Sequence, residues 1–215
     1  MVNSWSDVTV NQFLEIVGLE QEDLSPTEFL IERISIVTGE DYFDTDETEL
    51  KKILKQFNWI DKIPSKKSNQ SFKHLSFGNF VDLEFYCTNK APLENIDKIC
   101  ATIRGYELLT FECEKIQEES ILEHYTTIEN YISYRTKLLD KYKGLFEEDE
   151  DEDFEEDKDE MQQTKPEPTN NKWGWQRLIY QLCNGDITKA NEVTELPHIM
   201  VLNWLSMESE LKLKD

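Results

Sequence analysis

Apolar residues near the start of the chain are spaced as in an amphipathic helix. They recur every three to four residues after Thr9, which places them on one face of a helix. Thr9 and Gln12 form a capping box, and Gly18 stands where a left-handed residue would end the helix. The apolar stripe consists of Val10, Phe13, Leu14 and Val17. The pattern therefore predicts a helix that begins after Thr9 and ends at Gly18.

Two more helices are predicted before Pro64. Residues 25–28 supply a serine N-cap, a proline at the first helical position and a glutamate that can reach back to the cap. Gly39 ends this second helix. The third helix begins near Thr45 or Asp46, with acids in its first turn, and ends before the proline. Its predicted buried residues are Leu50, Ile53, Leu54 and Phe57.

Residues 61–76 interrupt the helical pattern. A polar turn rich in Lys, Ser and Asn separates two short segments, Ile60–Pro64 and Ser71–Leu75. Two such segments across a polar turn favour a small β-hairpin. Helical periodicity then returns, and it predicts helices over 77–86, over 92–105 and over 127–145. The stretch 106–116 alternates only in part and fits either a helix or a strand.

A run of acidic residues follows the last of these helices. Glu147–Glu160 holds twelve acids and one Lys, a net charge of −11. The whole stretch 147–171 contributes only two apolar side chains, so it cannot bury enough apolar area to offset its chain entropy. We predict a disordered acidic linker here. It is either a solvated spacer or a tether that screens or competes for a basic partner surface.

The composition changes again over residues 172–215. Three of the five tryptophans of the chain lie in this stretch. Helix signals predict a helix that ends at Gly185, a short helix capped by Asp186 and a last helix that starts at Pro197. The expected product is a small three-helix module. At some forty residues it is at the lower size limit for folding alone.

The aromatic residues of this module allow two interpretations. They either pack against the N-terminal domain or form a surface that binds a partner protein. The candidate partner-binding residues are Trp173, Trp175, Leu178, Tyr180, Leu202, Trp204 and Leu205. The candidate turn residues are Gly185, Asp186 and Pro197.

The charge of the chain limits its partners. It carries 23 Lys+Arg against 45 Asp+Glu, for a formal charge of −22 and a pI near 4.5. Such a chain is repelled by phosphate backbones, so nucleic acid and anionic membrane surfaces are poor partners. No run of 18 apolar residues and no basic, apolar leader is present, so we expect neither a membrane span nor secretion. The four cysteines match no zinc or redox spacing and are expected to be reduced thiols.

Local catalytic motifs are absent from the sequence. Its seven glycines are never closer than eleven residues, which excludes the glycine-rich loops that cradle phosphates. Serine nucleophile elbows, HExxH patterns and EF-hand spacings do not occur, and the histidines are isolated. We therefore expect a protein that is not an enzyme and that uses no cofactor and no metal. An enzyme would need isolated His, Cys and acidic residues to converge in space.

Several segments resemble tail assembly chaperones of tailed bacteriophages and the related baseplate-hub assembly proteins. The segments are SFGNFVDLEFY, PLENIDKICATIRG, KYKGLF, WGWQRLIYQLCNGDIT and ELPHIMVLNWLSMESE. The positions that carry the resemblance in the first module are Phe77, Gly78, Phe80, Asp82 and Leu83. In the second they are Trp173, Trp175, Leu178, Tyr180, Gly185, Asp186, Leu196, Pro197, Leu202 and Leu205. The acidic block is longer than is usual for the family.

The resemblance implies a mainly α protein with a helical N-terminal domain (1–146), an acidic disordered linker (147–171) and a small helical C-terminal module (172–215). It implies a non-enzymatic chaperone in the host bacterial cytoplasm that binds a tape measure, tube or baseplate hub protein during virion assembly. One alternative is a permanent structural component of the baseplate or tail. Another is an acidic inhibitor that binds a basic nucleic-acid-binding protein.

Overall fold

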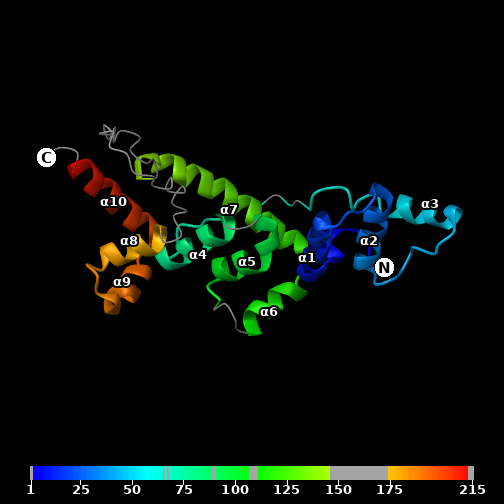
Figure 1. The fold of residues 1–215 in the computed structure, drawn as a ribbon, viewed down its shortest axis with the longest axis horizontal. Helices are drawn as coiled ribbons and strands as arrows, with labels where there is room; N and C mark the ends of the chain where they lie inside the picture. The colour runs from blue at the N-terminus through cyan, green and yellow to red at the C-terminus, as the bar shows by residue number, and fades with distance from the viewer. Residues whose placement is uncertain are drawn as a thin grey trace, which may run out of the picture. The chain divides into compact units, whose positions relative to one another are not determined.

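The protein is mainly α-helical, as the sequence predicts (Figure 1). The computed structural model describes residues 2–64, 66, 68–88, 91–106, 111–145 and 174–212. Ten α-helices and no β-strand lie within these residues. The predicted acidic linker over 147–171 lies outside the described residues.

The chain divides into two compact units. The first unit consists of Met1–Leu75 and Asn79–Thr136, and the second consists of Ser76–Gly78 and Lys137–Asp215. The chain passes from one unit to the other within two of its helices, α4 (Phe77–Thr88) and α7 (Ile121–Lys141). Each unit is therefore built from pieces that are distant in sequence.

The remaining helices of the first unit follow the predicted periodicity closely. They are α1 (Val10–Gly18), α2 (Pro26–Thr38), α3 (Glu47–Gln56), α5 (Ile96–Arg104) and α6 (Phe111–Glu118), with short 3₁₀ turns η1 (Trp5–Asp7), η2 (Leu19–Gln21) and η3 (Pro92–Asn95). The helix predicted from residue 127 begins six residues earlier, at Ile121. The ambiguous stretch 106–116 is helical from Phe111 onward.

Most of the predicted helix ends are confirmed. The capping boxes of Thr9 with Gln12 and of Ser25 with Glu28 are both present. The prediction of a left-handed Gly18 is wrong, because its φ is −58° and α1 continues directly into η2. The N–H of Leu19 bonds back to three carbonyls of α1, so a right-handed 3₁₀ turn satisfies the end of the helix without a left-handed residue.

The predicted hairpin is also wrong. The described residues of 60–64 and 71–75 contain no strand, and each segment instead sends side chains into the core. Ile60, Phe72 and Leu75 are buried, and the ring of Phe72 packs edge-on against Tyr131 at 5.4 Å. Burial against helices therefore replaces strand pairing. Of the residues predicted to be buried by the third helix, Phe57, which directly follows α3, is buried. Leu50, Ile53 and Leu54 within α3 are half-buried.

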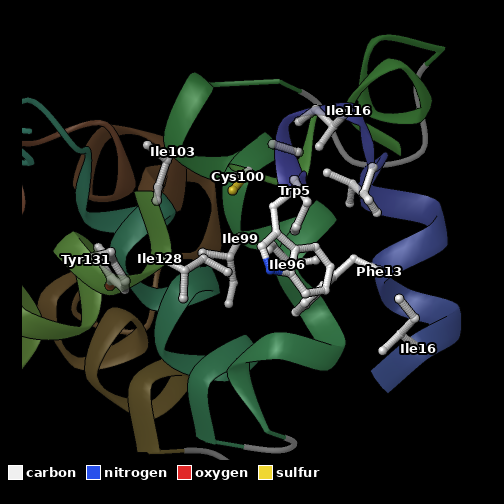
Figure 2. Close-up of a cluster of buried hydrophobic side chains, with 14 of the residues drawn as sticks. Trp5, Phe13, Ile16, Ile96, Ile99, Cys100, Ile103, Ile116, Ile128 and Tyr131 are labelled. Atoms are coloured by element: carbon white, nitrogen blue, oxygen red, sulfur yellow. The ribbon is translucent and has the colours of Figure 1, made fainter. Parts of the chain in front are cut away.

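The core of the first unit is a cluster of aliphatic and aromatic side chains (Figure 2). Trp5 lies within this cluster and packs edge-on against Phe13 at 5.9 Å and Trp59 at 5.4 Å. Its indole N–H donates a hydrogen bond to the backbone carbonyl of Lys62. Figure 2 also labels Ile16, Ile96, Ile99, Cys100, Ile103, Ile116, Ile128 and Tyr131. This cluster joins the N-terminal helices to α5 and α7.

A buried ion pair adds a specific polar contact between α4 and α7. The Nε and Nη2 atoms of Arg135 each donate to the carboxylate of Glu84 at 2.7 Å. The side chain of Glu84 is only 4% exposed. Because a buried carboxylate is costly without a partner, this pair fixes how the two helices meet.

Arg135→Met is expected to lower the free energy of unfolding by about 3 kcal/mol, because the Glu84 carboxylate stays buried without its partner. Adding Glu84→Leu is expected to restore most of that loss, since the buried charge is then removed as well. Urea unfolding followed by circular dichroism measures both variants. Lys51→Met, which breaks an exposed ion pair with Glu47, is the control and should change stability by less than about 1 kcal/mol. Wild-type stability of Arg135→Met would contradict the proposed role of the pair.

Candidate functional site

The second unit is built from short helices and two pieces of earlier chain. Its helices are α8 (Gly174–Leu182), α9 (Ala190–Thr194) and α10 (His198–Lys212), with the 3₁₀ turns η4 (Lys143–Leu145) and η5 (Ile187–Lys189) (Figure 1). The C-terminal end of α7 and residues Ser76–Gly78 complete the unit.

A groove of about 600 Å³ lies between η4, α8 and α10. Its lining is mostly leucine and tryptophan, with three polar residues also present. The lining residues are Leu145, Trp175, Leu178, Gln181, Leu182, Leu202, Leu205, Glu208 and Ser209. Helical spacing explains the lining: residues 175, 178 and 182 share one face of α8, and residues 202, 205 and 209 share one face of α10. We refer to this cavity as the leucine groove.

The leucine groove brings together four of the seven candidate partner-binding residues. Trp175, Leu178, Leu202 and Leu205 all line it. Leu202 is fully buried, and the other three are half-buried.

Two of the other candidates do not line the groove. Tyr180 and Trp204 are both exposed. Tyr180 lines a smaller apolar pocket of about 170 Å³, together with Ile179, Cys183 and Ile187. Trp173 lies outside the described residues.

Residues from the first resemblance segment support the groove. The ring of Phe77 packs edge-on against Trp175 at 6.1 Å. The N–H of Phe77 donates to the carbonyl of Leu196 at 2.7 Å, and Ser76 and Pro197 form an antiparallel bridge. These contacts hold the segment 76–78 against the loop before α10.

Gly78 allows this close approach. An added Cβ at this position would lie 3.1 Å from the Cβ of Thr194 and 3.4 Å from its carbonyl oxygen. Sequence reasoning assigned Phe77 and Gly78 to the first module and so missed their role here. The sequence feature that points to this close packing is Gly78 itself, a glycine at the second position of the helix predicted over 77–86.

A second polar contact attaches α10 to the end of α7. The buried Tyr142 donates its O–H to Oδ1 of Asn203 at 2.6 Å. Nζ of Lys141 in turn donates to the Tyr142 hydroxyl at 2.9 Å. Because Leu145 follows only three residues later, this contact also positions the η4 side of the groove.

The turn between α8 and η5 has the backbone that its sequence predicts. Gly185 has a φ of 76°, and the preceding Asn184 has a φ of 52°. The carboxylate of Asp186 accepts hydrogen bonds from the N–H of Thr188 at 3.1 Å and from its hydroxyl at 2.6 Å. These bonds hold the pKa of Asp186 below its usual value. Pro197 directly precedes α10, and its carbonyl accepts from the N–H of Met200 at 2.9 Å.

A second cavity, in the first unit, brings a cysteine and a histidine together. It has a volume of about 260 Å³, and Lys66, Cys100, Arg104 and His124 are among its lining residues. The thiol of Cys100 faces the backbone carbonyl of His124 at 3.7 Å, not its ring. Burial raises the pKa of Cys100 to about 12, so the thiol stays protonated near neutral pH.

The imidazole of His124 is committed to another partner. Its Nε2–H donates to the carboxylate of Glu119 at 2.9 Å, and Arg104 donates to the same carboxylate at 2.8 Å. A thiol nucleophile needs a nearby base to remove its proton. Cys100 and His124 line the same cavity, but the thiol is bonded to a backbone carbonyl and the imidazole to Glu119, so neither is bonded to the other.

Within the described ranges, no group of three or more His, Cys, Asp or Glu residues is arranged to hold a metal ion. None of the helices that the structure describes is long and apolar enough to cross a bilayer. No protein-family model, no curated protein and no solved structure matches the chain.

Gly185→Val is expected to destabilise the second unit by about 1 kcal/mol or more, because a β-branched residue is strained at positive φ. The added Cβ would also lie 2.9 Å from the hydroxyl oxygen of Tyr180, so that exposed ring must move. Hydrogen exchange of the α8 and α10 amides measures the effect within this unit. Asn184→Gly is the control and should be nearly neutral, since glycine accepts the same φ. Unchanged protection in Gly185→Val would show that the turn does not constrain the unit.

Stability is expected to fall as the pH drops from 7 to 5. Burial lowers the pKa of His124 below its usual 6.5, so the unfolded chain takes up a proton that the folded chain does not bind. The hydrogen bond from Arg104 lowers the pKa of Glu119. At still lower pH this carboxylate is therefore protonated in the unfolded chain before the folded one, and stability falls further. Urea midpoints across this pH range measure the effect. His124→Gln should flatten the upper part of the curve, whereas His74→Gln, at an exposed position, should leave it unchanged; equal curves for His124→Gln and wild type would contradict the assignment.

Proposed function

We propose that the protein is a non-enzymatic assembly chaperone of a tailed bacteriophage. It binds a tape measure, tube or baseplate hub protein in the host bacterial cytoplasm while the virion is assembled. The observation that carries this proposal is the leucine groove. It gathers Trp175, Leu178, Leu202 and Leu205, which all belong to the segments that resemble tail assembly chaperones.

The groove has the features of a protein-binding site. Its lining combines apolar and polar side chains and includes one large aromatic side chain, and such side chains often supply much of the binding energy at interfaces. Gln181, Glu208 and Ser209 add hydrogen-bonding groups that can fix the orientation of a bound segment. An apolar segment of a tail component would be removed from water here. This would keep that component from aggregating before assembly.

The acidic stretch 147–171 suits the same role. A high local charge with few apolar residues keeps a chain soluble, and we propose that this stretch is a disordered spacer and solubiliser. It joins Leu145 and Trp175 through the intervening sequence, and both residues line the groove.

The hydrogen bonds and protonation of Cys100 and His124 favour a binding function over a catalytic one. The Cys100 thiol is protonated and donates to a carbonyl, while His124 is held by Glu119. Neither group is prepared for nucleophilic attack.

Leu178→Ala with Leu205→Ala is expected to weaken capture of the tail component by roughly thirtyfold, since truncated interface anchors lose about 2 kcal/mol. Tagged protein is recovered from infected cells, and the captured tail proteins are quantified by mass spectrometry. Ile63→Ala, at an exposed apolar residue of the first unit, is the matched control. Thermal unfolding checks that the double variant remains folded.

Equal capture by the groove variant and the wild type would overturn the groove as the binding site. Failure of the wild-type protein to capture any tail protein would overturn the proposed function itself. Mass spectrometry of purified particles distinguishes a transient chaperone, which is absent from them, from a permanent tail or baseplate component.

A further inference from the structure

Helix α10 carries apolar side chains on two opposite faces. Val201, Leu202 and Leu205 face the interior of the second unit, where the first two are buried. The other face is exposed and equally apolar. Its residues are Met200, Trp204, Met207 and Leu211, whose exposed fractions lie between 47% and 58%. We refer to these four residues as the α10 outer stripe.

The spacing of the outer stripe is that of a helix-packing seam. Its residues follow one another at intervals of four, three and four, so at 3.6 residues per turn they lie within roughly 60° of the helix circumference. The stripe extends about 16 Å along the axis. A straight row of side chains with this spacing fits between the side-chain rows of a second helix. The flexible Met200 and Met207 can adjust to the surface of a partner around Trp204.

The charges around the stripe define the complementary partner. Glu208 and Glu210 flank it on either side, as their helical positions require. The chain as a whole has a charge of −22, of which −11 lies in 147–160. Acidic residues on both sides of an apolar helical seam favour a partner helix that carries basic residues at the matching positions.

A second copy of this chain is a poor occupant of the stripe. Four half-exposed side chains offer only a few hundred Å² of apolar area, whereas a stable dimer buries about 800 Å² per partner. Two chains that each carry a charge of −22 also repel one another. The small area limits any partner to a modest contact, and the charge favours a basic protein over a second copy.

We propose that the α10 outer stripe binds an amphipathic helix of a partner protein whose apolar seam is flanked by Lys or Arg. The four apolar residues of the stripe face away from the leucine groove, and Glu208 lies at the edge of both surfaces. The stripe is therefore a second interaction surface, which goes beyond the proposed function and does not depend on the groove.

The test uses the full-length protein and two labelled peptides of identical composition. One peptide forms a helix with leucines at alternating four- and three-residue intervals, flanked by lysine and arginine, and the other has the same residues in scrambled order. Fluorescence anisotropy is expected to show that the ordered peptide binds at least about tenfold more tightly than the scrambled one. Its affinity should fall as salt is added. Equal affinity for both peptides would overturn the proposal, since charge alone would then explain binding.

Trp204→Ala with Met207→Ala is expected to weaken the ordered peptide by about tenfold or more without changing the charge of the protein. The matched control is the groove variant, Leu178→Ala with Leu205→Ala, which should bind this peptide as the wild type does. A loss in the groove variant and not in the stripe variant would overturn the proposal. This pair of variants also separates the two hypotheses, because each surface is removed without the other.

A third variant tests the proposal even if the variant Trp204→Ala with Met207→Ala does not fold. Glu210→Lys reverses an exposed flanking charge, and it is expected to weaken binding of the basic peptide by several-fold. Sedimentation equilibrium of the wild-type chain tests whether a second copy of the chain occupies the stripe. A dimer that dissociates in Trp204→Ala with Met207→Ala would assign the stripe to a second copy and overturn the proposal. A monomeric chain would support it.

Discussion

The second unit depends on the contact between residues 76–78 and the loop before α10. A module of some forty residues cannot bury enough apolar surface to be stable alone, so it needs additional chain. Phe77 supplies a backbone hydrogen bond to Leu196 and an aromatic contact to Trp175, while Gly78 allows Thr194 to approach. The groove follows from this contact, because Phe77 braces the tryptophan that lines it. The groove in the C-terminal residues is therefore positioned by residues about a hundred positions earlier.

Helix α10 gives the unit two apolar surfaces because it is attached along only one side. The hydrogen bond from Tyr142 to Asn203 and the burial of Leu202 fix its inner face. Once that face is fixed, the side chains one hundred degrees or more around the helix remain in solvent. An exposed Trp204 side chain adds little to the stability of the fold. Its exposure is therefore better explained by binding than by folding.

Local features were predictable from the sequence, and contacts between distant segments were not. The boxes at Thr9 and Ser25 involve atoms three residues apart, so their sequence alone specifies them. The hairpin failed because Phe72 is buried against Tyr131, which lies 59 residues away and is invisible to a local pattern. The sequence predicts Trp175, Leu178 and Trp204 as partner-binding residues, and the structure places the first two at the groove and leaves Trp204 exposed. Burial distinguishes the inner and outer faces of α10, and burial depends on the fold.

Charge and apolar fit act on different steps of binding, and the chain separates them in sequence. The described residues of the second unit, 137–145 and 174–212, contain six basic and six acidic residues, so this part is neutral. The acidic run at 147–160 lies between them in sequence and carries −11. Long-range attraction speeds the encounter with a basic partner, whereas close apolar packing mainly sets how slowly the complex dissociates. The apolar side chains around Trp175 and Trp204 would thus provide the close packing, while Glu208 and Glu210 at the edges of these surfaces would attract a basic partner.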